Sequence, residues 1–227
     1  TDYDTADKLY FEPVTVEHVQ SVLDIEEPKG AILQFGGQTP LKLSHSISPI
    51  LGTDADAIDL CEDRDRFNQL LNRLGIRQPE GALAHTVDEA VSAAERIGFP
   101  LLLRPSYVLG GRGMVICDDR EQFDAALHEA MRVSEEHPVL LDRFLDNAVE
   151  YDVDALCDGD DVWIAAIMEH IEEAGVHSGD STTVIPAPRL SEACRAEMEA
   201  STRRLALELG VVGLVNVQYA VQNESVY

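Results

Sequence analysis

Stretches with the apolar pattern of β-strands follow one another closely in the middle of this 227-residue chain, and this feature constrains the fold most. Residues 99–104 (FPLLLR) and 114–117 (MVIC) flank a single glycine-rich loop, and the apolar runs at 149–157 and 162–170 are separated only by DGDD. Strands joined by short connections pair antiparallel, because a parallel pair needs a crossover of a dozen or more residues. Helical patterns interleave with these strands, so the sequence predicts an α+β fold rather than a purely parallel sheet.

Capping residues mark where the helices begin and end. Thr86-Val-Asp-Glu89 has the capping-box pattern, and the helix that it starts stops at Gly98. Gly75 ends an earlier helix, and Pro40 is expected at the first position of another. The patterns together predict helices at 15–25, from 40 onward, and at 63–74, 86–97, 119–134 and 191–209, and strands at 29–34, 99–104, 114–117, 139–141, 149–157, 162–170, 214–221 and 225–227.

The two ends of the chain are expected to be incomplete elements. Residues 1–60 hold one predicted strand and begin abruptly, so we interpret them as the end of an α/β unit. At the other end, Asn223-Glu224 is expected to form a hairpin turn, and only three residues follow it. We therefore expect a chain that continues in both directions.

The chain is strongly acidic, because Asp+Glu 42 against Lys+Arg 17 gives a net charge of −25. Such a charge repels phosphate backbones and anionic lipids, which argues against nucleic acids and membrane surfaces as partners. Only Lys8, Lys29 and Lys42 are lysines, and abundant carboxylate with little lysine suits concentrated salt, where repulsion is screened. We hypothesise a halophilic source; an ordinary acidic cytosolic protein is the alternative.

The sequence predicts a cytoplasmic location, because it shows neither a membrane-spanning run nor a secretion signal. No apolar run approaches the roughly 20 residues that a membrane-spanning helix needs. The N-terminal TDYDTADKLYFEP is acidic and lacks the basic and then apolar pattern of a secretion signal.

The loop between the strands at 99–104 and 114–117 combines glycines with Arg104 and Arg112. Glycines let backbone N–H groups approach a phosphate closely, and the arginines add positive charge, so the loop is a candidate lid over a triphosphate. No GK[ST] follows, so it is not a Walker A loop. A glycine hairpin with solvated arginines is the alternative. The earlier GGQT turn lacks the GxGxxG spacing of a dinucleotide-binding site, so we interpret it as a turn that connects a strand to a helix.

Three further segments carry polar groups suited to a charged ligand. LLDRFL at 140–145, followed by Glu150, offers strand-end backbone to a base and a carboxylate to ribose hydroxyls. MEHIEEAGVHSGDS at 168–181 is a polar loop after a strand; His170 and His177 are seven residues apart without a third soft ligand, which argues against zinc. Asn216 and Gln218 share one face of a strand, and an amide oxygen suits Mg²⁺. For 140–145 with Glu150, the alternative is a strand end with a surface glutamate. For Asn216 and Gln218, the alternative is an ordinary pair of polar strand residues.

Taken in order, these segments resemble the large subunit of carbamoyl-phosphate synthetase over essentially the whole chain. That subunit has two similar halves, and PSYVLGGR, EYDVDA and MEHIEEAGVHSGDS resemble the second half, which phosphorylates carbamate. The resemblance implies the C-terminal part of a pre-ATP-grasp domain at 1–60 and an ATP-grasp domain at 61–227, truncated at its C-terminus. The matching segments are TDYDTADKLYFEPVT, QFGGQTPLKLS, CEDRDRF, LRPSYVLGGRGM, VLLDRFLDNAVEYDVDALCDG, MEHIEEAGVHSGDS and GLVNVQYAV.

The resemblance also implies roles for individual residues. Catalytic roles are implied for Arg104 and His177, and a magnesium ligand for Gln218. Glu150 matches the carboxylate that binds ribose, and Arg143 stands where the family often has His. The residues expected to bind nucleotide are Arg64, Arg104, Arg143, Leu145, Glu150, Gly175, Val176, His177, Ser178 and Gln218.

The implied reaction is attack of carbamate on the γ-phosphate of ATP, with Mg²⁺ or Mn²⁺, to give carbamoyl phosphate for arginine and pyrimidine biosynthesis. The implied protein partner is a glutaminase small subunit. The family's next motif, a Glu-x-Asn-x-Arg run with further metal ligands, would follow Tyr227, so we expect the isolated chain to be inactive. The alternatives are a non-catalytic ATP-binding module and another ATP-grasp ligase that forms a different acyl phosphate.

Overall fold

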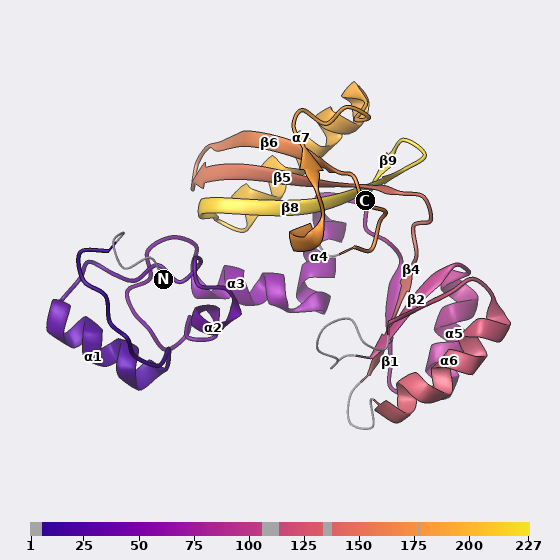
Figure 1. The fold of residues 1–227 in the computed structure, drawn as a ribbon, viewed down its shortest axis with the longest axis horizontal. Helices are drawn as coiled ribbons and strands as arrows, with labels where there is room; N and C mark the ends of the chain where they lie inside the picture. The colour runs from indigo at the N-terminus through magenta and orange to yellow at the C-terminus, as the bar shows by residue number, and fades with distance from the viewer. Residues whose placement is uncertain (1–5, 106–113, 134–137, 177) are drawn as a thin grey trace. The chain divides into compact units, whose positions relative to one another are not determined.

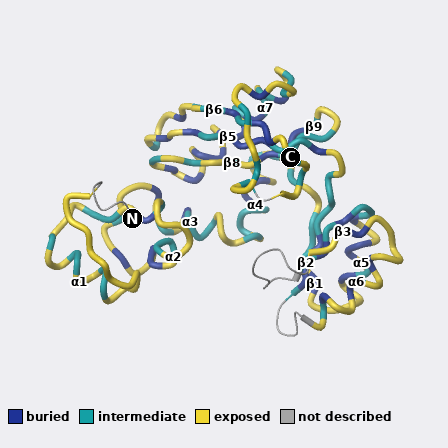
Figure 2. Tube along the Cα trace, in the orientation of Figure 1, coloured by how far each residue is buried: buried dark blue, intermediate teal, exposed yellow. Residues whose placement is uncertain are grey.

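The protein is described by a computed structural model that covers all residues except 1–5, 106–113, 134–137 and 177 (Figure 1). The chain forms two compact units. The first comprises Thr1–Gly75, Asp154–Ala165 and Glu199–Val217; the second comprises Ile76–Val153, Ala166–Met198 and Gln218–Tyr227. Residues 6–30 are largely exposed, whereas buried residues concentrate in the sheets and their helices (Figure 2).

One sheet lies within the second unit and has the strand order β1-β4-β2-β3. Its strands are β1 (Gly81–Ala84), β2 (Leu101–Pro105), β3 (Val115–Cys117) and β4 (Val139–Arg143), and every neighbouring pair is antiparallel. Helices α5 (Val87–Ile97) and α6 (Arg120–Val133) cover one face (Figure 1).

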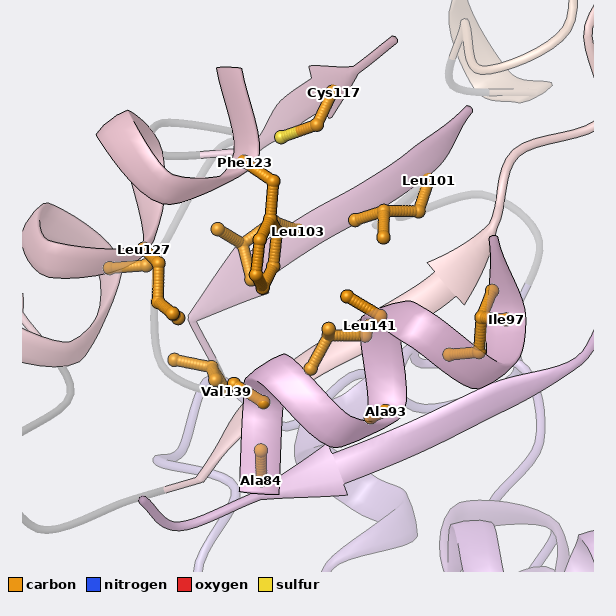
Figure 3. Packing of buried hydrophobic residues seen from close by; sticks show 13 residues of the cluster. Ala84, Ala93, Ile97, Leu101, Leu103, Cys117, Phe123, Leu127, Val139 and Leu141 are labelled. Carbon is orange, nitrogen blue, oxygen red and sulfur yellow. The ribbon is translucent and has the colours of Figure 1, made fainter. Parts of the chain in front are cut away.

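The core between this sheet and its helices is entirely apolar. Leu101, Leu103 and Leu141 alternate with less buried neighbours and are fully covered, and Phe123 from α6 packs among them (Figure 3). Helix α6 contributes the buried side chains of Phe123, Leu127 and Ala130, and Met131 is partly buried against the same core.

A second sheet has the strand order β7-β6-β5-β8-β9. Helix α7 (Glu192–Glu208) accompanies it, and the Tyr219 hydroxyl of β8 donates to the Met198 carbonyl of α7 at 3.4 Å. Both sheets together confirm the predicted α+β class. The strands are β5 (Val149–Asp158), β6 (Val162–His170), β7 (Thr183–Val184), β8 (Val212–Gln222) and β9 (Ser225–Val226).

Three predicted helix boundaries are confirmed together with their caps. The Asp63 carboxylate accepts the Arg66 N–H at 2.9 Å and starts α4 (Arg64–Leu74), which ends at Gly75 with a φ of 64°. Thr86 accepts the Glu89 N–H at 3.2 Å, while the Glu89 carboxylate bonds the N–H of His85 rather than that of Thr86. The hairpin turn between β8 and β9 is also confirmed, with positive φ at Asn223 and Glu224.

The first 75 residues correct two predictions. Residues 29–34 do not form a strand, because their one pairing among the described residues is a parallel bridge from Ala31 to Ile50, and Pro49 in the partner segment has no N–H to extend the ladder. Pro40 is not the first helical residue, since α2 (Gln38–Leu41) begins two residues earlier; proline fits there because the first turn needs no N–H. Helix α1 (Val16–Glu26) agrees with the prediction.

Helix α3 (Ala55–Glu62) and strands β1 and β7 were not predicted. Helix α3 starts at Asp54, whose carboxylate accepts the Ala57 N–H at 2.9 Å. Strand β1 (GALA) consists of residues with low strand preference, and β7 has two residues, so each is defined by its neighbouring strand rather than by its own pattern.

Candidate functional site

A group of ionisable side chains lies on β5 and at the end of β6, within the second unit. Glu150 and Asp152 are two residues apart on β5 and therefore point to the same face of the sheet. His170, the last residue of β6, lies between them and has no exposed side-chain surface. Burial of charge is costly unless partners compensate it, so this group is a candidate site rather than ordinary core.

The contacts of His170 and Glu150 are unequal. His170 Nε2 lies 2.8 Å from Asp152 Oδ2, which is a hydrogen bond. His170 Nδ1 lies 3.7 Å from Glu150 Oε2, and both atoms are buried without a hydrogen-bond partner among the described residues. The other Glu150 oxygen, Oε1, accepts the Gly175 N–H at 3.2 Å. Glu150 thus connects β5 to the loop that follows β6.

Gly175 is the residue that this loop conformation requires. Its φ is 99°, in the region that residues with a Cβ rarely adopt. A Cβ there would lie 3.9 Å from Phe144, an ordinary contact, so the requirement comes from the backbone and not from crowding. Val176 is partly exposed, and Ser178 begins a short 3-10 helix, Ser178–Asp180.

Glu169 and Arg189 form an ion pair beside this group. The Glu169 carboxylate has no exposed surface; its Oε2 accepts the backbone N–H of Arg189 at 2.8 Å and its Oε1 accepts from the guanidinium. Arg189 Nη2 also donates to the His170 carbonyl at 3.2 Å. These contacts compensate the buried carboxylate and hold the end of β6.

Tyr151, between Glu150 and Asp152 on β5, faces the opposite side of the sheet and is 2 % exposed. Burial, with the nearby Glu169 carboxylate, raises the pKa of its phenol to about 12, so the phenol stays neutral at physiological pH.

A pocket of about 530 Å³ opens beside the loop after β6. Four carboxylates, one guanidinium and the Phe144 ring line it, so its electrostatic character is acidic. Desolvation opposes ionisation of Glu172, but hydrogen bonds from the backbone N–H groups of Glu172 and Thr182 outweigh it and lower the Glu172 pKa. The charged residues of this lining are Asp118, Asp146, Glu172, Glu173 and Arg189.

The predicted phosphate-binding arginine on β2 is partly exposed. Arg104 Nη2 lies 3.3 Å from Asp142 Oδ2 on β4, and about two-fifths of its side chain is exposed. Its Nε is buried and has no partner among the described residues. The guanidinium therefore keeps donors for an anionic ligand. The glycine loop, Arg112 and the predicted catalytic His177 lie outside the described residues.

Arg143 and Leu145 have structural contacts of their own. Arg143 Nη1 donates to the carbonyl of Ile97, the last residue of α5, at 3.0 Å. A cation at this place favours the helix C-terminus, so Arg143 has a capping role that the sequence analysis missed. Leu145 is half-buried, and its carbonyl accepts the Ala148 N–H at 3.2 Å.

The remaining predicted residues, Gln218 and Arg64, belong to other elements of the structure. Gln218 is exposed on β8, on the same strand face as Asn216, as the alternation predicts. Asn216 donates to Asp154 at 2.8 Å, within the first unit. Arg64, also in the first unit, is the first residue of α4. Of the predicted residues, Glu150 and Gly175 are joined directly by a hydrogen bond.

The described residues offer neither a metal-binding cluster nor a membrane-spanning helix. No set of three or more His, Cys, Asp or Glu side chains is arranged to hold a metal ion among the residues that the structure describes. Over the same residues, no helix has both the length and the apolar character needed to cross a membrane.

Four residues of this group were not predicted as site residues from the sequence: Asp152, Glu169, His170 and Arg189. The alternation EYDVD places Glu150 and Asp152 on one face, and that was the available signal. Glu150 and Asp152 contact His170 only because β5 and β6 are neighbours in the sheet. The contact of Arg189 with Glu169 depends on the path of the chain after β7.

Two family models match the chain. Residues 1–60 match the "Carbamoyl phosphate synthase preATP-grasp domain", and residues 63–227 match the "Carbamoyl-phosphate synthase L chain, ATP binding domain". The carbamoyl phosphate synthase large chain, C-terminal section, of Aquifex aeolicus is 57% identical over all of this chain and 43% of the relative. The large chain of Archaeoglobus fulgidus is 54% identical over all of this chain and 22% of the relative. The chain thus spans less than half the length of these relatives.

Solved structures with low sequence identity share the fold. The biotin carboxylase of Campylobacter jejuni, in a β,γ-ATP complex, has a TM-score of 0.75 and 19% identity over 99% of this chain and 55% of that one. The N5-carboxyaminoimidazole ribonucleotide synthetase of Thermus thermophilus has a TM-score of 0.74 and 21% identity over 93% of this chain and 56% of that one. The predicted combination of a pre-ATP-grasp and an ATP-grasp domain is confirmed, and the chain belongs to the carbamoyl-phosphate synthase large-chain family.

Proposed function

We propose that this chain binds MgATP and contributes the site that phosphorylates carbamate, the second phosphorylation in carbamoyl phosphate synthesis. One observation carries the nucleotide site: the Glu150 carboxylate is held by the Gly175 N–H and faces His170, on a fold shared with proteins solved with ADP and MgADP. The choice of the second half rests on the 57% identity to a relative named a C-terminal section.

The proposed roles follow the chemistry of each side chain. Arg64 and Arg104 neutralise phosphate charge, and Glu150 accepts hydrogen bonds from the ribose hydroxyls. Arg143 and Leu145 flank the adenine, and the loop of Gly175, Val176, His177 and Ser178 lines the nucleotide. Gln218 offers an amide oxygen, a donor type that Mg²⁺ or Mn²⁺ accepts. When bound, the cation neutralises charge on the phosphates.

The proposed reaction needs positioning more than covalent catalysis. A carbamate oxygen attacks the γ-phosphorus of ATP, the bond from this phosphorus to the β,γ-bridging oxygen breaks, and carbamoyl phosphate and ADP leave. Arg104 donates to the phosphoryl oxygens, where negative charge is concentrated, and His177 is proposed to stand beside the same group. A closed glycine loop excludes water from carbamate and its product.

We also propose the wider setting. The domain boundary lies at residues 60 and 61, and the partner is a glutaminase small subunit that supplies ammonia. The protein is cytoplasmic, serves arginine and pyrimidine biosynthesis, and works in concentrated salt. This last proposal predicts a higher midpoint of urea unfolding in molar KCl than in dilute KCl; equal midpoints would overturn it.

The first test is nucleotide binding. Calorimetry with MgADP is expected to show binding that weakens about 10-fold or more in Arg104→Ala, because a charge-assisted contact to phosphate is lost. Arg120→Ala is the matched control, since Arg120 is a surface residue of α6 that pairs with Asp124 of the same helix and with Glu95 of α5. Equal weakening in both variants would contradict the phosphate role of Arg104.

The second test is the reaction, in a chimera in which these 227 residues replace the aligned residues of the Aquifex aeolicus C-terminal section. ATP formation from MgADP is expected with carbamoyl phosphate and not with acetyl phosphate. Preference for acetyl phosphate would favour another acyl-phosphate ligase. A folded chimera that binds MgADP without turnover would favour a non-catalytic module.

A further inference from the structure

The His170 ring is buried between two carboxylates, and one of its two ring nitrogens has no hydrogen-bond partner among the described residues. Nε2 is bonded to Asp152 at 2.8 Å, whereas Nδ1 faces Glu150 Oε2 at 3.7 Å. Nδ1 and this Oε2 are two of the three buried side-chain atoms without a partner in the described part of the chain. Buried polar atoms are nearly always paired, so two of them facing each other point to a function.

The partners assign the protons on the ring. An ionised Asp152 only accepts hydrogen bonds, so Nε2 carries a proton. A neutral ring would then present the lone pair of Nδ1 to a carboxylate oxygen, which is repulsive. A doubly protonated ring instead presents an N–H to Glu150. The other charged groups near the ring are Glu169, Glu172 and Arg189, which bonds the His170 carbonyl.

The Glu150 carboxylate has acceptor capacity left over after these contacts. Two carboxylate oxygens offer about four lone-pair sites. The Gly175 N–H occupies one site on Oε1, and an N–H on Nδ1 would occupy one on Oε2. One lone pair on each oxygen remains, which matches two adjacent hydroxyl donors.

We infer that His170 is a positioning residue that fixes the plane of the Glu150 carboxylate so that both oxygens accept from the adjacent hydroxyls of a ribose. This inference rests on the proposed function, in which Glu150 binds ribose. Gly175 fixes one carboxylate oxygen from the loop, and His170 fixes the other from β6. The hydrogen bond between Asp152 and His170 Nε2, the nitrogen that faces away from Glu150, sets the orientation of the ring.

The test compares MgADP with its 2′,3′-dideoxy analogue, which lacks both hydroxyls. In the full chain, calorimetry is expected to give an affinity about 10-fold or more higher for ADP, because each hydroxyl bonds a charged acceptor. Glu150→Gln is expected to lower this preference. If His170 only fills space, its substitution would change the affinities for MgADP and for the dideoxy analogue by the same factor. The ratio of the two affinities would then stay the same.

Two conservative variants separate the nitrogens of the ring. His170→Gln keeps an amide near the position of Nε2 and the contact with Asp152, but removes the donor to Glu150, so the preference is expected to disappear. His170→Asn places an amide near Nδ1 and is expected to retain most of the preference. Near-ultraviolet circular dichroism establishes that each variant is folded; if His170→Gln does not fold, loss of the preference in His170→Asn overturns the inference.

The outcomes distinguish the inference from the proposed function. No binding of MgADP by the wild-type chain would contradict the proposed function itself. Binding with an intact ribose preference in folded His170→Gln would overturn the inference and leave the proposed function standing.

Discussion

The two sheets of this protein bury different kinds of side chain. The cluster beneath the four-stranded sheet consists entirely of Ala, Ile, Leu, Val, Phe and Cys. The five-stranded sheet buries Asp152, Glu169 and His170 together with the neutral phenol of Tyr151. Apolar burial needs only volume and shape, whereas each buried charge needs a specific partner. The four-stranded sheet therefore contributes mainly stability, whereas the five-stranded sheet carries an energetic cost where the proposed nucleotide site lies.

The largest expected effect is in the apolar sheet. Phe123→Ala removes a ring with no exposed surface and is expected to lower the free energy of unfolding by about 3–5 kcal/mol, from lost burial and the cavity left behind. Urea denaturation measures this change. Phe35→Ala is the control, because Phe35 is 73% exposed, and its effect is expected within about 0.5 kcal/mol. Similar effects in both variants would show that burial of the Phe123 ring does not stabilise the four-stranded sheet.

The second effect tests the charged sheet. Arg189→Met leaves the Glu169 carboxylate buried without its guanidinium partner and is expected to cost about 2 kcal/mol; the full cost of a buried pair is not expected, because half of the Arg189 side chain is exposed. Adding Glu169→Gln should recover part of this loss in urea denaturation. Arg195→Met, which breaks a surface pair with Glu192, is the control. No recovery in the double variant would show that Glu169 does not need its partner.

The third effect depends on pH. The folded protein holds the Tyr151 pKa at about 12, above the ordinary value of 10, so the unfolded chain loses this proton first as pH rises. Stability from this group is therefore complete below pH 10 and declines between pH 10 and 12, by about 1–2 kcal/mol. Urea midpoints across this range should fall more steeply in the wild type than in Tyr151→Phe. Parallel curves would show that the phenol is not specially buried.

The smallest effect compares the helices that accompany the two sheets. Thr86→Ala removes the cap of α5 and is expected to cost about 1 kcal/mol. Ser191→Ala should cost slightly more, because Ser191 accepts the Cys194 N–H of α7 and also donates to the Glu224 carboxylate at 2.6 Å. Urea denaturation of both variants measures the difference. A larger loss for Thr86→Ala would contradict the view that charge-assisted contacts strengthen the second sheet.

The sequence predicted the elements that carry their own signals. Residues 162–170 form β6 as predicted, because the apolar run is bounded by acidic turn residues, and α4 and α5 begin and end at their capping residues. The predicted strand at 29–34 was wrong because a strand needs a partner, and Ala31 finds one bridge.

The candidate site was predictable only where one segment contained it. The motif at 168–181 contains both His170 and Gly175, but only Gly175 was a predicted site residue, and Glu150 came from its own segment. The contact of His170 with Asp152 joins residues 18 positions apart, and Arg189 reaches Glu169 from a further segment. Such contacts depend on strand order and on the path of a loop, which local patterns do not encode.

The position of β4 in the middle of the first sheet sets an order of events during synthesis on the ribosome. In the sheet order β1-β4-β2-β3, β1 and β2 both pair with β4, so this sheet is complete only after residue 143 has emerged. Strand β8, which pairs with β5, ends about 80 residues later, a delay of roughly 4–16 s at roughly 5–20 residues per second. During that interval the apolar sheet is able to close, whereas β5, with the carboxylates of Glu150 and Asp152, still waits for its second neighbour.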